Sequence, residues 1–311
     1  IYTLSLHDAL PILEALNDFS ESSTYKEDKD YWMEQISLIP PAPMLPLQKD
    51  PSVIRKPQFA RIEKVIPKSE WNVLQKEAKK KGITTSTLLC TAYALVLGYW
   101  SNQPELTINV TVFTRYPFNE GVTDIVGDFT SVILLRVNLL GRSDFWKLAS
   151  EIQNQLMDAL EHRHYDGMNV IRKIAEQAEM KEQAVMPVVF TSLLFSMEEG
   201  DIVTIEDLGE VKMGVSQTSQ VYLDYQVMET KEGLLITWDY IKELFTPNMI
   251  STMFKQYINI VESLSKNVIS MPHLDSKEQE VFTAYNDTKL DMPILPIQTT
   301  FKKIAEKDRK S

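Results

Sequence analysis

The sequence predicts an α/β protein, a two-layer sandwich in which helices pack on a mixed β-sheet. Two observations lead to this fold class. Segments with helical spacing of apolar residues and segments with strand-like spacing follow one another along the chain, which indicates helices and strands in one layered structure. The chain also has 311 residues, of which 44% are hydrophobic. That is enough to bury a sizeable core in one large domain or two smaller ones.

The first fifty residues predict little regular structure. A polar, loose stretch extends to about Asp28 and is followed by a short amphipathic helix that begins near Tyr31. Prolines then occur at positions 40, 41, 43, 46 and 51. Because proline fixes φ and removes a backbone donor, we expect an extended connector that lies over a surface.

Two packed helices are expected next. The first covers about 70–81, with Ser69 as its cap and Gly82 as its stop signal. The second begins at Thr84 or Thr85 and ends near residue 100. Both place apolar residues at helical spacing, so each should bury one face.

The middle of the chain predicts two strands and two helices. Residues 105–113 alternate between apolar and polar, which is typical of a strand with one buried face. Residues 129–140 are almost continuously apolar and predict a more deeply buried strand. A long helix over about 144–162, capped by Ser143, and a shorter one over about 168–179 should follow.

Three more strands and a long helix complete this part of the chain. Pro187 introduces a strand over 188–196. Residues 220–240 predict two strands joined by a turn at Glu232 and Gly233. Thr246 and Pro247 mark the start of the last helix, with threonine as its cap and proline at its first position.

The charge and the cysteine content narrow the class of protein. The formal net charge is −11 and the acidic residues are spread along the chain, which argues against a nucleic-acid or anionic-membrane partner. Cys90 is the single cysteine and lies in an apolar run, so we expect a core residue and a reducing, cytoplasmic compartment. No apolar run reaches the roughly 18 to 20 residues of a membrane span, and no signal-peptide pattern occurs.

The histidine pair in EHRHYDG (161–167) is the first candidate for proton transfer. His162 and His164 are two positions apart, so on a helix they point to different sides, which does not suit a metal site. We interpret the stretch as a helix end with the turn after it, and His273 as a linker residue. The sequence lacks HExxH, GxGxxG, GxxxxGK[ST] and GxSxG motifs, so we expect no metal site.

Asp224 is a second candidate, because aspartate is depleted in strands. The alternation places it on the opposite face from Leu223 and Tyr225. It belongs either to a solvated outer face or to a cavity, where desolvation would raise its pKa and favour proton transfer near neutral pH. Thr191 and Ser192 interrupt an apolar strand, and their hydroxyls either bond to neighbouring backbone or take part in a site.

Several segments, taken together and in order along the chain, carry a family resemblance. They are LIPPAPMLPL (38–47), GITTSTLLCTAYALVLGYW (82–100), GDFTSVILL (127–135), PVVFTSLLF (187–195), SQTSQVYLDYQV (216–227) and ITWDY (236–240). They resemble the heterocyclization variant of the condensation domains of nonribosomal peptide synthetases, and the resemblance covers roughly residues 28 to 270. A further stretch, residues 285–307, resembles the linker and first helix of an adenylation domain. Ser219 and Thr85 stand where the family commonly has proline.

This resemblance implies a domain organisation and a chloramphenicol-acetyltransferase-like lobe. The family's N-terminal lobe, with its paired-aspartate motif, is absent, and the active site of the family lies between the two lobes. We therefore expect the isolated chain to be inactive. The expected divisions are 1–12, a non-native, adapter-like segment that contains His7; 13–27, a remnant or linker; 28–275, the C-terminal lobe; and 276–311, a linker and the truncated start of an adenylation domain.

The resemblance also implies a transferase-type activity in secondary metabolite biosynthesis. A carrier-bound Cys, Ser or Thr is acylated, and its side chain is then cyclodehydrated to a thiazoline or oxazoline. By motif position, Asp224 is the acid/base and Thr191 its orienting hydroxyl, while Ser192 and Gln220 are candidates for the substrate tunnel. No cofactor is expected to bind directly, because carrier domains deliver the substrates on phosphopantetheine arms.

The partners that the resemblance implies are the upstream and downstream carrier domains, the N-terminal lobe and the adjacent adenylation domain. Two alternatives stay open. One is an ordinary amide-forming condensation domain, against which GDFTSVILL and PVVFTSLLF argue. The other is a non-catalytic fragment that only docks carrier domains. The sequence also leaves open whether Cys, Ser or Thr is cyclized.

Overall fold

The structure is a computed structural model that describes most of the chain. The described residues are 14–116, 127–141, 144–179, 184–194, 213–266, 268–273, 276–288 and 297–308. The chain divides into two compact units, Ile1–Pro272 and His273–Ser311. The second unit contains α9 (Ser276–Asn286) and α10 (Ile297–Asp308). The first unit contains all six strands of the described sheet and the helices from α2 to α8.

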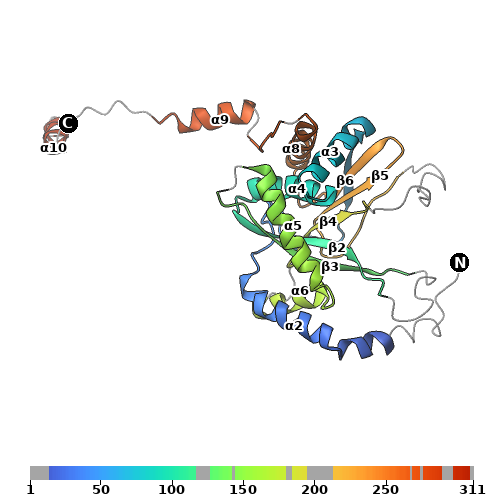
Figure 1. Ribbon diagram of the computed structural model, residues 1–311. Helices are drawn as coiled ribbons and strands as arrows, with labels where there is room; N and C mark the ends of the chain where they lie inside the picture. The colour runs from blue at the N-terminus through green and yellow to red at the C-terminus, as the bar shows by residue number, and fades with distance from the viewer. Residues whose placement is uncertain are drawn as a thin grey trace. The chain divides into compact units, whose positions relative to one another are not determined.

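Six strands form one mixed sheet in the described part of the first unit (Figure 1). Their order across the sheet is β1-β6-β5-β4-β2-β3. Strand β4 pairs in parallel with both β2 and β5, and the other neighbours are antiparallel. The strands are β1 (Phe59–Pro67), β2 (Glu105–Phe113), β3 (Thr130–Asn138), β4 (Val188–Ser192), β5 (Leu223–Glu229) and β6 (Gly233–Ile241).

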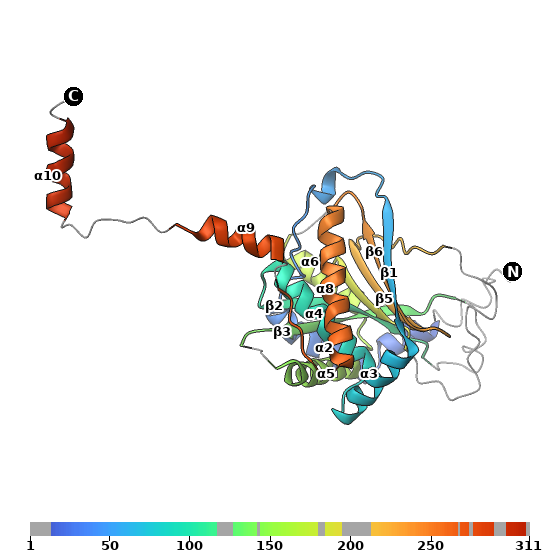
Figure 2. The same ribbon diagram turned by 90° about the horizontal axis from the view of Figure 1, so that it is seen from above.

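One face of the sheet is apolar and is covered by three helices, α3 (Lys68–Lys80), α4 (Thr85–Ser101) and α8 (Pro247–Ser265). Figures 1 and 2 show these helices on the same side of β5 and β6. Phe190, Tyr225 and Trp238 are register partners across β4, β5 and β6, so their side chains emerge from this one face. The contact with α8 includes the ring of Tyr257, whose hydroxyl lies 2.6 Å from that of Tyr225.

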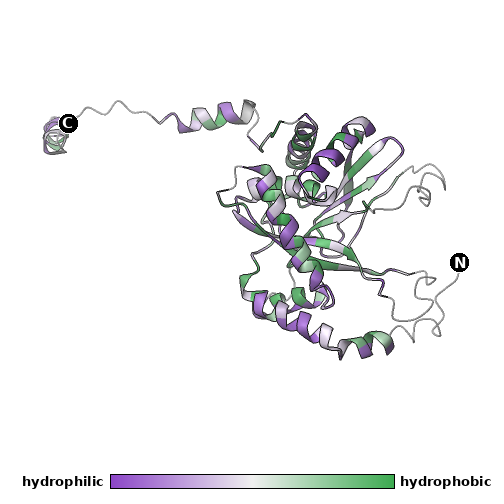
Figure 3. Ribbon diagram, viewed as in Figure 1, coloured by the Kyte–Doolittle hydropathy of each residue, from purple (hydrophilic) through white to green (hydrophobic). Residues whose placement is uncertain are grey.

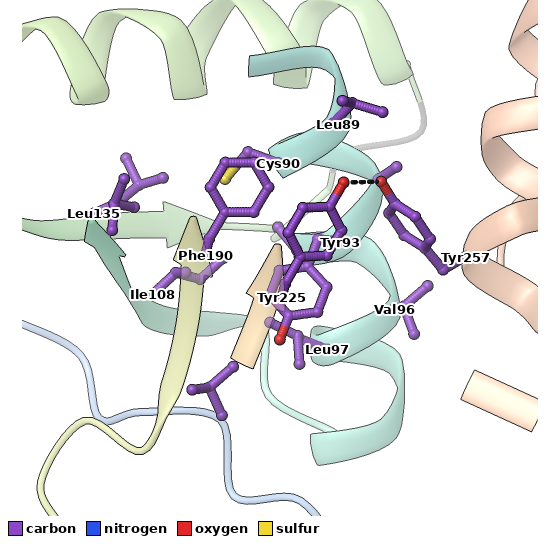
Figure 4. Close-up of a cluster of buried hydrophobic side chains, with 14 of the residues drawn as sticks. Leu89, Cys90, Tyr93, Val96, Leu97, Ile108, Leu135, Phe190, Tyr225 and Tyr257 are labelled. Atoms are coloured by element: carbon purple, nitrogen blue, oxygen red, sulfur yellow. Dashed lines mark hydrogen bonds between the residues drawn. The ribbon is translucent and has the colours of Figure 1, made fainter. Parts of the chain in front are cut away.

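Cys90 belongs to this core, as expected, and is 1% exposed (Figure 4). It lies on α4, one turn before Tyr93, whose ring centroid is 5.0 Å from that of Tyr225. Burial raises the pKa of the Cys90 thiol to about 12. The residue is therefore a packing element of the core.

The first unit also contains the helices α2 (Ser23–Gln35), α5 (Phe145–Glu161) and α6 (Gly167–Gln177). Helices α5 and α6 contact β3, the edge strand of the sheet. Figure 3 shows hydrophilic and hydrophobic residues mixed along α5, and the hydrophobic ones among them include the buried Phe145, Leu148 and Ile152. This is the one-sided burial of an amphipathic surface helix.

The stretch EHRHYDG is the end of α5 and the turn into α6, as the sequence predicts. Its backbone and side chains hold α2 in place: His164 donates its backbone N–H to Asp28 Oδ2 at 2.9 Å, and its Nδ1 lies 2.9 Å from the same oxygen. Trp32 donates to the carbonyl of His162 at 2.8 Å. Asp166 caps α6 by accepting from Met168 N–H. The stretch therefore joins three helices.

Several local expectations were wrong. The residues before Asp28 are not loose, because Ser22 caps a helix that begins at Ser23. Ser69 does not cap α3, which begins at Lys68 after Pro67 without a side-chain cap. The cap of α5 is Asp144, and the expected cap, Ser143, lies outside the described residues. Strand β1 was not anticipated at all.

No single helix among the described residues has both the length and the hydropathy of a membrane span. Helices α3 and α4 reach that length and hydropathy only when taken together, and they are bent by 98° at the break between them.

Candidate functional site

The second face of the sheet is polar, although much of it is buried. Asn109, Asp224 and Asp239 occupy one row across β2, β5 and β6, in register with Val189 of β4 and Arg61 of β1. All three polar residues are buried. A cavity of about 440 Å³ lies over this face, and we call it the polar cavity. Its wall is formed by residues of β2, β3, β4 and β5, by Met168 and Ile171 of α6, and by the segment 216–221.

Asp224 lies in the centre of this face and lines the polar cavity. Its side chain is not on a solvated outer face, since the residue is only 6% exposed. The amide of Gln226 donates to Oδ2 at 2.9 Å, whereas Oδ1 is buried without a hydrogen-bond partner among the described residues. Burial raises the pKa of Asp224, and the charge of Asp239 adds to this effect, while Gln226, Ser216 and Arg61 act against it. Such a carboxyl group can both take up and release a proton at a less acidic pH than usual.

Thr191 also lines the polar cavity, on β4 next to Asp224 of β5. Its Oγ1 lies 2.9 Å from Oγ1 of Thr111 on β2. Its register partner on β5 is Gln226, the residue whose amide holds Asp224. The hydroxyl is therefore fixed by a second hydroxyl, and the group that orients Asp224 in this structure is the amide of Gln226.

The structure separates the two expected tunnel residues. Gln220 lines the polar cavity and has a φ of 62°, a left-handed conformation that costs about 1 to 3 kcal/mol for a residue with a side chain. Ser192 follows Thr191 on β4, so its side chain points to the opposite face. There its Oγ lies 2.7 Å from Oγ of Ser86 on α4. The polar cavity thus brings together Asp224, Thr191 and Gln220 but not Ser192.

Next to Asp224 lies an ion pair that the sequence reasoning missed. Asp239 is the register partner of Asp224 on β6 and is 2% exposed. Arg61 of β1 donates to it twice, from Nε to Oδ1 at 2.8 Å and from Nη2 to Oδ2 at 2.6 Å. The backbone N–H of Ser216 donates to Oδ2 at 2.6 Å. Asp239 therefore accepts three hydrogen bonds, two of them from a guanidinium.

Some of the missed residues left a signal in the sequence. Aspartate is depleted in strands, and Asp239 in ITWDY breaks that rule as Asp224 does. Thr111 occupies a polar position in the alternation of 105–113. Arg61 left no such signal, because the strand that contains it was not recognised. Within the described residues, no group of three or more His, Cys, Asp and Glu side chains could hold a metal ion.

The sheet, the helices on its apolar face and the cavity on its polar face define an α/β protein with the chloramphenicol-acetyltransferase-like fold. Residues 12–289 match the model of the family described as Condensation domain. The chain therefore belongs to the condensation-domain family of nonribosomal peptide synthetases, and the predicted fold class is confirmed.

The curated relatives are much longer proteins. Bacitracin synthase 1 of Bacillus licheniformis is 39% identical over 292 residues, which are 93% of this chain and 6% of the relative. Pyochelin synthetase PchE of Pseudomonas aeruginosa is 31% identical over 246 residues, 78% of this chain and 17% of the relative. Phenyloxazoline synthase MbtB of Mycobacterium tuberculosis is 33% identical over 235 residues, 75% of this chain and 16% of the relative.

Solved structures give the same picture. The EpoB cyclization-docking bidomain from Sorangium cellulosum superposes with a TM-score of 0.73 at 31% identity, over 81% of this chain and 51% of that one. The synthetase FmoA3 superposes with a TM-score of 0.75 at 29% identity, over 93% of this chain and 30% of that one. This chain thus spans about half or less of these structures.

Proposed function

We propose that this chain is part of a heterocyclization domain of a nonribosomal peptide synthetase. In this role it acylates a carrier-bound Cys, Ser or Thr and closes that residue's side chain into a thiazoline or oxazoline. The observation that supports the proposal most is the geometry of Asp224: its carboxyl group is buried, the residue lines a cavity, and its Oδ1 has no hydrogen-bond partner among the described residues. The names of relatives add support, since they include a phenyloxazoline synthase and a cyclization bidomain.

The first reaction needs little acid/base chemistry from this site. The amine of the carrier-bound amino acid attacks the upstream acyl thioester, a C–N bond forms, and the C–S bond breaks to release the upstream carrier's thiol. The product is a linear amide on the downstream carrier.

The second reaction is where Asp224 acts. The carboxylate accepts the proton of the side-chain S–H or O–H as this group attacks the amide carbonyl, and it passes the proton to the oxygen that becomes a hydroxyl. The amide N–H then loses its proton, which Asp224 transfers to the departing hydroxyl as the C=N bond forms. The two protons of the released water thus come from the nucleophile and from the amide nitrogen. Positioned proton transfer of this kind contributes about 10²- to 10⁴-fold.

Thr191 and Gln220 have supporting roles in this proposal. The Oγ1 atoms of Thr191 and Thr111 lie 2.9 Å apart. When Thr111 donates in this pair, the Thr191 hydroxyl can donate its own proton to the oxygen of the tetrahedral intermediate. Gln220 lines the polar cavity, and in this proposal it contacts the substrate as part of the cavity wall. The domain binds no cofactor directly in this proposal. Its substrates arrive on phosphopantetheine arms of upstream and downstream carrier domains, and it works with an N-terminal lobe and an adenylation domain.

The test replaces the carboxyl group by an amide in a complete synthetase module that contains this chain. We expect Asp224→Asn to leave formation of the linear amide largely intact and to reduce ring formation by about 10²-fold or more, because the proton acceptor is lost. Mass spectrometry of the carrier-bound product separates the two species, since the linear product retains one water.

The matched control is Glu229→Gln, the same chemical change at an exposed position of the same strand. It should cyclize at the rate of the unchanged module. Normal ring yield in Asp224→Asn would contradict the role of Asp224. A linear amide as the sole product of the unchanged module would show that the domain is an ordinary amide-forming condensation domain, and no condensation at all would favour the non-catalytic alternative.

A further inference from the structure

The ion pair of Arg61 and Asp239 is more than a link between two strands, because it also contacts the wall of the polar cavity. Ser216 lines the cavity, and its backbone N–H donates to Asp239 Oδ2 at 2.6 Å. Two residues earlier, a Cβ at Gly214 would lie 3.0 Å from Nη1 of Arg61. The guanidinium therefore lies directly against the backbone of the segment 213–216. This segment leads into Thr218, Ser219 and Gln220, which also line the cavity.

The same pair sets the charges beside Asp224. Two aspartates occupy opposite positions of β5 and β6, and both are buried. Two carboxylates this close disfavour each other's ionisation, whereas a nearby guanidinium favours it. Arg61 binds Asp239 through two hydrogen bonds, one from Nε to Oδ1 and one from Nη2 to Oδ2. Asp224 then experiences a fixed negative charge from β6 and a fixed positive charge from β1.

The other charged or titratable groups around Asp224 are few. Within the described residues they are Glu63 further along β1, Tyr222 before β5, Asp128 across the polar cavity and Tyr93 on the opposite face of the sheet.

We propose that Arg61 and Asp239 are positioning residues of this site: together they hold the segment 213–220 as a cavity wall and fix the charge opposite Asp224. The proposal rests on the proposed role of Asp224, but it concerns two residues that do not touch the substrate. It gives a role to an ion pair at a place in the sheet where an apolar pair would often be as stable.

The direct test measures the ionisation of Asp224 rather than activity. The apparent pKa of Asp224 is read by NMR from the carboxyl carbon in the 311-residue chain labelled at aspartate, with Asp224→Asn used for assignment. Removing the positive charge in Arg61→Gln should raise the pKa, and removing the negative charge in Asp239→Asn should lower it. Each shift should be about 1 unit or more, as is usual for charges within about 4 to 6 Å. In the double variant Arg61→Gln/Asp239→Asn, the pKa of Asp224 should be close to its value in the unchanged chain.

Two controls distinguish an effect of the Arg61 charge on the pKa of Asp224 from a general disruption of the fold. Arg61→Lys keeps the positive charge and should shift the pKa less than Arg61→Gln. If Arg61→Gln does not fold, the double variant is compared with Asp239→Asn instead. Loss of Arg61 in the Asp239→Asn background should still raise the pKa of Asp224. Shifts of the same sign in Arg61→Gln and Asp239→Asn, or no shift in either, would overturn the proposal.

Ring formation in the complete module then gives a second readout. The acid limb of its pH profile should move to higher pH in Arg61→Gln and to lower pH in Asp239→Asn, because the base form of Asp224 is required. If the NMR shifts occur and the pH profile does not move, the positioning holds and the proposed role of Asp224 fails. If ring formation requires Asp224 and the pKa does not respond, the positioning alone is wrong.

Discussion

A carboxyl group on a central strand, as in Asp224, lowers the stability of the fold when it ionises. Its Oδ1 is buried and has no hydrogen-bond partner among the described residues, and an unpaired buried charge is costly. The pKa of Asp224 is raised for this reason. Residues kept in such an environment are frequent at functional sites, so a trade between stability and activity is expected at this position.

The trade can be measured through the pH dependence of stability. Because the pKa of folded Asp224 is above its unfolded value, the folded state binds the proton more tightly, and stability is lost as the pH rises from the unfolded pKa through the folded one. Asp224→Asn should therefore raise the melting temperature at about pH 8, and raise it less at about pH 4. The gain corresponds to about 1.4 kcal/mol for each unit by which the pKa is raised.

Asp128→Asn is the control with the opposite sign. Hydrogen bonds from Thr130 lower the pKa of Asp128, so its contribution is present above the unfolded pKa and is lost as the pH falls. This variant should lower the melting temperature near neutral pH, with a deficit that shrinks in acid. An equal effect of Asp224→Asn at both pH values would contradict the raised pKa.

At the scale of the elements, α6 and β3 approach each other closely at a glycine. A Cβ at Gly167, the first residue of α6, would lie 2.1 Å from the carbonyl oxygen of Val132. Both atoms belong to backbone or are fixed to it, so neither can move without shifting its element. The glycine therefore lets the end of EHRHYDG pack against the edge strand.

We predict that Gly167→Ala destabilises the protein by about 1 to 3 kcal/mol, the usual effect of overpacking a closely packed contact. Chemical denaturation followed by circular dichroism measures the change. Gln177→Ala places the same alanine at the exposed end of the same helix and should change stability by less than about 0.5 kcal/mol. Equal stability of Gly167→Ala and the unchanged chain would show that α6 is free to move away from β3.

The elements also show how far sequence reasoning reaches. The alternation of residues 105–113 predicted β2 with the observed bounds, and the Thr246 and Pro247 start of α8 was confirmed, because these signals are local. Strand β1 was missed because FARIEKVIP mixes charged and apolar residues, and its pairing partner β6 is more than 160 residues away in the sequence. Because β1 was missed, Arg61 was missed too, and Arg61 is one of the two partners of the ion pair beside the site. The burial of Asp224 was undecided for a similar reason, since its cover comes from other strands and from 216–221.

At the scale of the molecule, the first unit is divided by its sheet into an apolar side and a polar side. The apolar side contains Cys90, which is 1% exposed and belongs to the same core cluster as Phe190 and Tyr93 (Figure 4). A thiol there reports on the integrity of the whole apolar layer. Its pKa is raised to about 12 by burial, so the reactive thiolate is scarce near pH 8 and the sulfur is also shielded from reagents.

We therefore predict that the native chain does not react with a thiol reagent at about pH 8, and that reaction appears only as the layer opens. Labelling measured across a urea titration should follow the same transition as tryptophan fluorescence, because Trp238 on β6 belongs to the same core. Coincident transitions would indicate that the apolar layer unfolds as one cooperative unit. Complete labelling without denaturant would mean that α4 separates from the sheet in the native state, and a helix that opened so readily could not fix the strands behind Asp224.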